Sequence, residues 1–241
     1  MWTEEFPLNG EDIPILQKSD HTYTDKCGQQ YKSVSSILSL VKPKFDTEGK
    51  ALEYAHRKKM AVEDVLQLWE EKKNTGLNFG TMIHENVETF FKEKKILNER
   101  YSEIVEEIFD KVYIDGGYNE LICFDKGKKI CGTADYVQFK DNSFIISDFK
   151  TNLKFNFENA FQDKFLLNPV IHLPNSEYFI YALQLSFYAR MISNITGLIC
   201  ESLDIYWLKR QIDTKDVFRG KWLKYTVPYL KKEVEDILCL V

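Results

Sequence analysis

The spacing of hydrophobic and polar positions changes several times along the chain. Between about residues 33 and 112 the apolar residues mostly recur every three or four positions, as on one face of an α-helix. Over 119–151 they alternate or form short runs between turn residues, which is typical of β-strands. A long loop is expected over 153–176, and a strong helical pattern follows it. The pattern therefore predicts an α/β protein.

Breaker residues divide the first helical region. Ser33 is a suitable N-cap for a helix that Pro43 ends. Two further helices follow, and Asn74 and Gly76 predict the end of the second. Another helix is expected to begin near Gly80. Its buried face should contain Ile83, Val87, Phe90 and Phe91.

The second half of the chain should contain a three-stranded antiparallel meander whose turns lie at Lys126–Gly127 and Asp141–Asn142. From residue 80 onward the predicted order is roughly α(α)βββαβα with a mixed sheet. The expected elements are helix 101–112, strands 119–125, 128–139 and 143–151, helix 177–193, strand 203–210 and helix 229–241.

Length and composition are those of a chain with a sizeable core. The 241 residues, of which 44% are hydrophobic, allow one compact unit with a helical extension. We expect an N-terminal segment at 1–78 that carries the extension, and a core at 79–241. No run of apolar residues is long enough for a membrane span, and the acidic N-terminus does not resemble a signal peptide.

The cysteines and the net charge further restrict the kind of protein that the sequence predicts. The five cysteines are scattered with no CxxC pair, which predicts reduced thiols and disfavours a zinc ribbon. The expected location is the cytoplasm of a bacterial or phage-infected cell, or another reducing compartment. A net charge of −5 does not by itself mark a nucleic-acid-binding protein, although local patches matter more than the sum.

The segment "IISDFKTN" at 145–152 places two charges in an apolar strand. With a two-residue turn at Asp141–Asn142, Asp135 would lie opposite Asp148, with Lys150 further along the same face. With a two-residue turn at Lys126–Gly127, Glu120 would lie opposite Thr133 on this face. Facing carboxylates are unfavourable unless a cation lies between them.

Three acids and a lysine on one patch suit metal-assisted hydrolysis of a phosphodiester. Carboxylate oxygens are ligands for Mg²⁺ or Mn²⁺, and the bound metal activates water and stabilises charge on the phosphate. A nearby lysine can orient the water. The alternative is a structural Asp–Lys pair within the sheet, which is the usual explanation of an isolated D-x-K.

The segment "GTADYVQFKDNSFIISDFKT" at 132–151 resembles the core of the PD-(D/E)XK nuclease superfamily. More narrowly, the chain resembles the RecB-like exonucleases, which include phage exonucleases and the mitochondrial genome maintenance exonuclease. Three other motifs match: "GTMIHENVETF" at 80–90, "YALQLSFYARM" at 181–191 and "YKSVSSIL" at 31–38, where Ser35 replaces the usual threonine. Together they cover about residues 30–210.

This resemblance implies a restriction-endonuclease-like αβββαβ core, a mixed central sheet flanked by helices. It makes Asp135 and Asp148 metal ligands with His84 as a third and the Phe149 backbone carbonyl as a fourth, and Lys150 the catalytic lysine. Glu120 matches an acid on the first strand whose role varies. The residues implied in DNA binding or in support of the site are Ser33, Ser35, Thr151, Gln184 and Tyr188.

The resemblance also implies cofactors and partners. Mg²⁺ or Mn²⁺ is expected, and no iron–sulfur cluster, because the four-cysteine spacing of some relatives is absent. The expected substrate is DNA, as a single strand or a duplex end, cleaved by an exonuclease in replication, recombination or repair. A replication or recombination protein is a possible partner, and no oligomeric state is predicted.

Two alternative functions stay open. One is a structure-selective or restriction-type endonuclease with the same site, and the other is a non-catalytic DNA-binding subunit that retains the fold. His84 alone would also fit a core histidine. The basic run at 55–59 fits a solvated helix face or a phosphate contact. The phenylalanines of the 153–176 loop fit packing on the protein body or stacking on unpaired bases, and they are Phe155, Phe157, Phe161 and Phe165.

Overall fold

A computed structural model describes residues 15–17, 22–157, 164–214 and 218–241. The strands are β1 (Ile15–Gln17), β2 (Thr22–Thr24), β3 (Gln30–Ser33), β4 (Tyr118–Asp125), β5 (Ile130–Phe139), β6 (Ser143–Lys150), β7 (Ile199–Asp213) and β8 (Phe218–Val227). The α-helices are α1 (Val34–Leu38), α2 (Thr47–Lys58), α3 (Val62–Glu93), α4 (Ser102–Val112), α5 (Glu177–Thr196) and α6 (Lys231–Leu238). Short 3₁₀ helices occupy Ser39–Val41 and Glu99–Tyr101.

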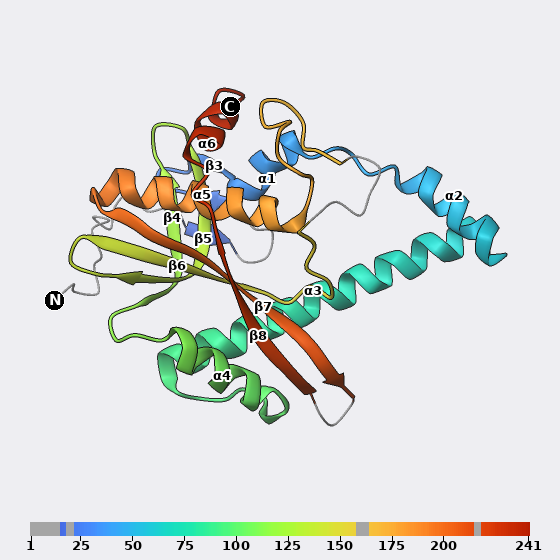
Figure 1. Ribbon diagram of the computed structural model, residues 1–241, viewed down its shortest axis with the longest axis horizontal. Coiled ribbons are helices and arrows are strands. Elements are labelled where there is room, and N and C mark those ends of the chain that lie inside the picture. Colours follow the sequence, from blue (N-terminus) through green and yellow to red (C-terminus); the bar gives the residue numbers. More distant parts are fainter. Residues whose placement is uncertain (1–14, 18–21, 158–163, 215–217) are drawn as a thin grey trace.

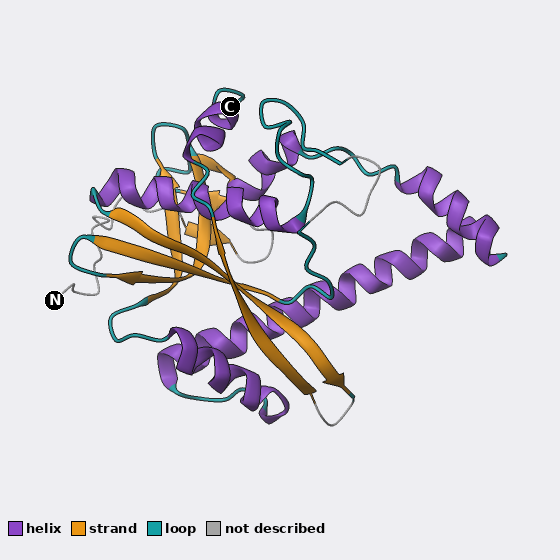
Figure 2. Ribbon diagram, in the orientation of Figure 1, coloured by secondary structure: helices purple, strands orange, loops and turns teal. Residues whose placement is uncertain are grey.

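The strands form one open, mixed sheet in the order β1-β2-β3-β5-β6-β7-β8, with β4 also paired to β5. The pairs β3–β5 and β6–β7 are parallel, and the other pairs are antiparallel. Helices lie on both sides of the sheet (Figures 1 and 2). The prediction of an α/β protein with a mixed sheet and flanking helices is therefore confirmed.

Two apolar clusters hold the helices on the sheet. On one side, residues of α1, α5 and α6 pack against Phe144 and Ile146 of β6. On the other side, residues of α3 and α4 pack against Phe149 of β6, Tyr136 of β5 and Trp222 of β8. Adjacent residues of β6 thus face opposite layers, as the alternation along a strand requires.

Several predicted elements are confirmed by the structure. The three strands of the meander and helices α4, α5 and α6 lie within a few residues of their expected positions. Ser33 caps α1, because its Oγ accepts a hydrogen bond from the Ser36 backbone N–H at 3.1 Å. The β5–β6 register is also confirmed, since Val137 lies opposite Ile146 and Phe139 opposite Phe144.

The predicted helix end at Asn74 and Gly76 is wrong. Helix α3 continues through both residues to Glu93, and so crosses the boundary expected between 1–78 and 79–241. A helical glycine costs only about 1 kcal/mol relative to alanine, and packing holds α3 at both ends. Near its start it contacts α2, and near its end it lies on the main sheet.

Strand β8 and the N-terminal strands were not predicted from the sequence. In β8 only three residues are buried, Phe218, Trp222 and Val227, and charged residues occur between them. This composition is common in an edge strand, where one side of the backbone has no neighbouring strand. The pattern therefore did not reveal that β8 pairs with β7 along most of its length.

The predicted two-residue turn between β4 and β5 is also wrong. Asp125 pairs with Ile130, so the turn contains four residues, 126–129. The Asp125 carboxylate stabilises it by accepting a hydrogen bond from the Lys128 backbone N–H at 2.9 Å. The register moves by two residues, so that Glu120 lies between the residues that pair with Tyr136 and Ala134, across from Asp135 instead of Thr133.

Close packing of α5 on β5 predicts that Gly132→Ala will destabilise the protein. A Cβ at Gly132 would lie 2.5 Å from Cε1 of Tyr188, and such overpacking costs about 1–3 kcal/mol. Gly76→Ala is the matched control, because a Cβ there has no neighbour within 4 Å. It should stabilise helix α3 by up to about 1 kcal/mol. Urea unfolding of both variants measures the difference, and equal stabilities would contradict this packing.

Two expectations from composition concern membranes and thiols. In the described part of the chain, no helix combines the length and apolarity needed to cross a membrane. All five cysteines are free thiols, and Cys123 and Cys131 are buried.

Candidate metal centre

The candidate site lies where strand β5 leaves strand β6. Their ladder extends from Phe139 only to Tyr136, which pairs with Ser147. The preceding part of β5 pairs with β4 and β3 instead. Asp135 is the first residue beyond the ladder, and its Oδ2 accepts a hydrogen bond from the Phe149 backbone N–H at 2.6 Å. The carboxylate thus joins the two strands where backbone pairing stops.

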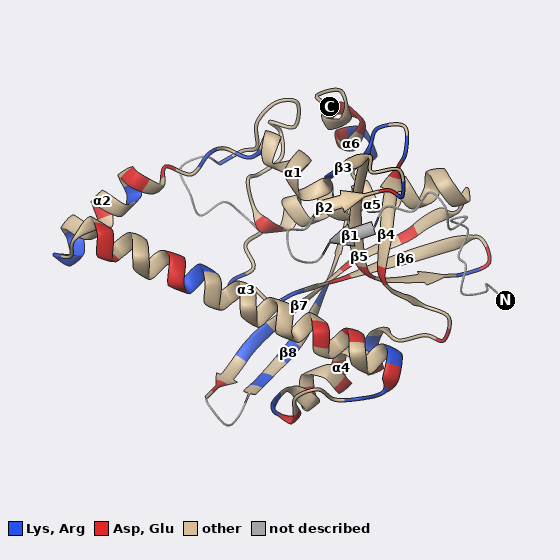
Figure 3. Ribbon diagram, turned by 180° about the vertical axis from the view of Figure 1, so that it is seen from behind, with Lys and Arg blue, Asp and Glu red and all other residues tan. Residues whose placement is uncertain are grey.

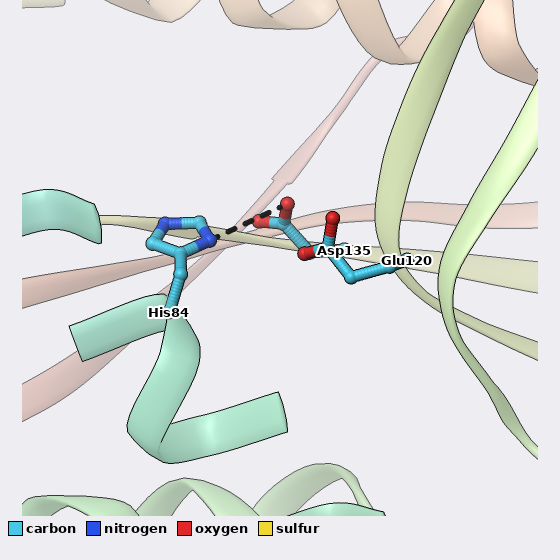
Figure 4. Close-up of side chains that lie close together, drawn as sticks. All are labelled: His84, Glu120 and Asp135. Carbon is cyan, nitrogen blue, oxygen red and sulfur yellow. Dashed lines mark ion pairs between the residues drawn. The ribbon is translucent and has the colours of Figure 1, made fainter. Parts of the chain in front are cut away.

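Glu120 reaches the same place from β4. It lies between Asn119, which pairs with Tyr136, and Leu121, which pairs with Ala134. Its φ of 51° is uncommon for a residue other than glycine. Residues held in this conformation tend to occur at functional sites. The local twist directs the Glu120 carboxylate toward Asp135 and His84 (Figure 4).

His84 completes the group from helix α3. The helix passes close to the end of β6 at Gly80, where a Cβ would lie only 3.2 Å from Thr151 Oγ1. One turn later, His84 Nδ1 lies 3.6 Å from Asp135 Oδ1. The candidate ligand atoms of His84, Glu120 and Asp135 all lie within 4.8 Å of one another.

The chemistry of this group fits a divalent cation. All three side chains are partly exposed, so that an ion and its water ligands have access. Two carboxylates and one imidazole suit Mn²⁺ well, and the carboxylates also suit Mg²⁺. We call His84, Glu120 and Asp135 the acid–histidine group.

Asp148 and Lys150 form a buried ion pair beside the acid–histidine group. Asp148 Oδ2 lies 2.6 Å from Lys150 Nζ, and the Asp148 side chain is only 2% exposed. Burial raises the pKa of Asp148 to about 6, and the charge of Asp135 acts in the same direction, while Lys150 and His84 oppose the shift. The two aspartates are thus electrostatically coupled.

Lys150 keeps its proton at neutral pH. Burial alone would lower its pKa, but the carboxylates of Asp148 and Asp135 outweigh burial and raise it. The Nζ also lies 4.7 Å from the centre of the Tyr181 ring, a favourable cation–π distance. Lys150 is therefore a hydrogen-bond donor and a fixed positive charge, and not a general base.

The acid–histidine group differs from the ligand set that the sequence suggested. Glu120 takes the place expected for Asp148, whose carboxylate lies outside the group and contacts Lys150. Direct coordination by Asp148 and by the Phe149 carbonyl stays a prediction. The phenyl ring of Phe149 belongs to the core, where its centre lies 6.3 Å from that of the His84 ring.

Gln184 and Tyr188, which the resemblance implies in support of the site, lie on helix α5. Gln184 Nε2 donates a hydrogen bond to the Tyr188 hydroxyl at 2.9 Å. Tyr188 is only 3% exposed, which leaves it almost no surface for DNA. Its pKa is raised by burial and by the charge of Asp148, so its hydroxyl stays neutral near the ion pair.

The remaining predicted residues have different positions. Ser33 serves as the N-cap of α1, and Ser35 is exposed on that helix. Neither belongs to the acid–histidine group. Thr151 is nearly buried, and its carbonyl accepts a hydrogen bond from Arg210 Nη2 at 3.1 Å. Thr151 therefore anchors the chain directly after Lys150.

Tyr181 and Arg210 lie near Lys150 and Thr151 but were not among the predicted site residues. Tyr181 lies one turn before Gln184 on α5, so helical spacing could have identified it. Burial raises its pKa to about 12, and its ring faces Lys150. Arg210 lies 3.7 Å from the centre of the Phe79 ring and holds the Thr151 carbonyl. No sequence signal places Arg210 near the site, because β7 and α3 meet only in the fold.

The raised pKa of Asp148 predicts a pH dependence of stability in the metal-free protein. The folded carboxyl has a pKa of about 6, whereas an unfolded aspartate has one of about 3.9. This group's contribution is therefore complete below about pH 4 and is lost as the pH rises through about 6. Urea unfolding of wild type and Asp148→Asn across this interval should show wild type losing stability relative to the variant. A relative gain would mean that the folded pKa is lowered.

No protein-family model matches the sequence, and no curated protein is significantly similar to it. The geometry and electrostatics of these side chains, together with the motif resemblance, are therefore the basis for inferring a function.

Proposed function

We propose that this protein is a divalent-metal-dependent deoxyribonuclease of the PD-(D/E)XK, RecB-like type, acting as an exonuclease. The main supporting observation is the acid–histidine group beside the buried Asp148–Lys150 pair. A purely structural Asp–Lys pair would not require two further carboxylates and a histidine at the same place. The candidate ligand atoms of Glu120 and Asp135 lie within 4.8 Å of each other, so the two carboxylates repel, and a cation between them would offset this repulsion.

Mg²⁺ or Mn²⁺ would be held by His84, Glu120 and Asp135. The bound ion would supply charge stabilisation at the scissile phosphate and a more acidic water molecule. The fit depends on the donor set, two carboxylates and an imidazole whose ligand atoms lie within 4.8 Å. The charge of Asp148 is balanced by the Lys150 ammonium, so the carboxylates of Glu120 and Asp135 would supply most of the attraction for the cation.

Lys150 would act as a donor and as a fixed charge. Its raised pKa keeps it an ammonium group, which can orient a water molecule and stabilise negative charge on a phosphate oxygen. Asp148 holds Nζ at 2.6 Å, and Tyr181 borders the same ammonium. These contacts limit the motion of Lys150 and reduce the entropy lost when substrate binds.

Cleavage of end-labelled DNA tests the proposal. Single-stranded, duplex and covalently closed circular DNA are incubated with the protein and Mg²⁺, Mn²⁺ or a chelator. We expect metal-dependent release of short 5′-phosphorylated products from linear DNA, while the closed circle stays intact. Cleavage of the circle would identify an endonuclease instead. Absence of cleavage, with no shift in the melting temperature on addition of either metal, would overturn the proposal and favour a non-catalytic DNA-binding subunit.

A further inference from the structure

One face of the β7–β8 hairpin continues directly from the candidate site. Trp207 on β7 pairs with Lys150 on β6 and with Leu223 on β8. Two residues further along, Lys209 pairs with Lys221. Because side chains alternate along a strand, these residues share the face that carries Lys150. We call Trp207, Lys209, Lys221 and Leu223 the lysine face.

The two lysines of this face lie directly opposite each other, so their positive charges repel. Like charges directly opposite each other destabilise a sheet. Both lysines are exposed, and neither belongs to an ion pair in the described part of the chain. Three other basic residues of the hairpin are each paired with a carboxylate: Arg210 with Asp213, Arg219 with Glu103, and Lys224 with Asp204.

This contrast points to an anionic ligand for Lys209 and Lys221. The chain is acidic overall, with a net charge of −5, so it has enough carboxylates to form ion pairs with both lysines. Basic residues are nevertheless concentrated along β7 and β8 (Figure 3). Phosphate groups of a nucleic acid would neutralise the lysine pair, and such contacts supply much of nucleic-acid affinity.

The lysine face lies where it could bind a nucleic-acid strand that leads to the candidate site. A rise of about 3.3 Å per residue puts Lys209 roughly 7 Å beyond the row that contains Lys150 and Trp207. The Trp207 Nε1–H donates to the Asn152 carbonyl at 2.7 Å, which holds the two segments together. The other face of the hairpin packs in the core through Leu208 and Trp222.

An exposed aromatic side chain borders the lysine face. The Phe155 ring stacks on Tyr225, with centres 4.9 Å apart and an angle of 7°. Phe157 contacts Tyr225 at 5.0 Å but is 44% exposed. Tyr225 follows Leu223 by two residues on the same face. Phe155 thus packs on the body, whereas Phe157 offers a ring on which an unpaired base can stack. Phe165 is exposed, and Phe161 lies outside the described residues.

We propose that the lysine face binds the backbone of single-stranded DNA through Lys209 and Lys221, with a base stacked on Phe157. The inference rests on the proposed function for the identity of the polymer. It goes further in naming the surface and in requiring unpaired bases, because the ring of Phe157 can stack only on a base that is accessible outside a duplex.

Fluorescence anisotropy of labelled single-stranded DNA tests the lysines without cleavage. The full chain is used with a chelator present, and the salt concentration is varied. The double variant Lys209→Ala/Lys221→Ala should bind at least about tenfold more weakly and reduce the slope of log K against log salt by about 1.4, since each phosphate contact to a single strand contributes about 0.7. The control Lys92→Ala/Lys95→Ala removes the same charge, from the last turn of α3 and from the segment just after it, and should bind as wild type does.

Phe157→Ala tests the requirement for unpaired bases. It should weaken binding of single-stranded DNA about tenfold and leave binding of a blunt duplex unchanged. If the lysine variant and its control bind equally, or if Phe157→Ala weakens duplex binding to the same extent, the inference is overturned.

These outcomes separate the inference from the proposed function. Suppose that wild type binds single-stranded DNA in the presence of the chelator, that the variants do not bind it, and that no DNA is cleaved with metal. This result would support the DNA-binding surface and contradict the nuclease proposal. If the lysine variant binds and cleaves DNA as wild type does, the nuclease proposal is supported and the proposed DNA-binding surface is contradicted.

Discussion

Replacing Lys150 with methionine is expected to slow DNA cleavage about 10²–10³-fold, the usual effect of removing one donor that stabilises developing charge. The ammonium lies 2.6 Å from Asp148 and stays protonated at neutral pH. Methionine has a similar length but neither charge nor donor. The rate is measured with end-labelled DNA at saturating metal. Lys154→Met, an exposed lysine in the following loop, is the control and should cleave within about twofold of wild type.

A measurement of metal binding shows whether Lys150→Met has lost only its catalytic group or has also lost its folded structure. Because the acid–histidine group does not include Lys150, we expect Mn²⁺ to raise the melting temperature of Lys150→Met as much as that of wild type. Asp135→Asn should lose both this rise and cleavage, since it removes a ligand. Asp148 is left without its cation in Lys150→Met and can take up a proton, which limits the cost to stability. A Lys150→Met protein that cleaves within threefold of wild type would remove Lys150 from the mechanism.

Truncation of Trp222 to alanine is expected to reduce the free energy of unfolding by about 3–5 kcal/mol. The side chain is 1% exposed and belongs to the apolar cluster between the sheet and helices α3 and α4. Its ring centre lies 5.9 Å from that of Phe149. Its Nε1–H donates to the Ile104 carbonyl at 2.8 Å, which fixes α4 on β8. Alanine would leave a cavity and remove this bond. Urea unfolding of the metal-free protein measures the change.

Two variants show whether the cavity or the hydrogen bond dominates. Trp222→Phe keeps much of the volume but has no indole N–H, so it should cost less than Trp222→Ala. Trp69→Phe, in the partly exposed contact between α2 and α3, is the control and should cost less than about 1 kcal/mol. A cost below this value for Trp222→Ala would mean that α4 and β8 are not coupled through this side chain.

Much of the central sheet was predictable because its signals are local. The alternation in β5 and β6, and the polar pair Asp141–Asn142, determine a hairpin whose register the structure confirms. That register brings Asp135 close to the end of β6. The strong helical pattern of α5 and the Ser33 cap are local signals of the same kind.

Other features depended on contacts that the sequence does not display. Lys126–Gly127 resembled a tight turn, but the Asp125 side chain stabilises a four-residue turn. This difference moved Glu120 opposite Asp135. Asn74 and Gly76 resembled a helix end, but α3 continues because packing at both ends offsets their low helix propensity. Edge strand β8 carried too many charges to be recognised.

Local patterns in the sequence were enough to place Asp135, Asp148 and Lys150 on neighbouring strands, because the alternation of side chains and the β5–β6 hairpin register are local properties. Which side chains lie close enough together to be candidate ligands depends on contacts between distant segments. The tertiary structure brought His84 from α3 and Glu120 from β4 to Asp135, and it buried Asp148 against Lys150. The physical reason is that the site forms where β5 leaves β6, and that position depends on helix packing and strand pairing between segments far apart in the chain.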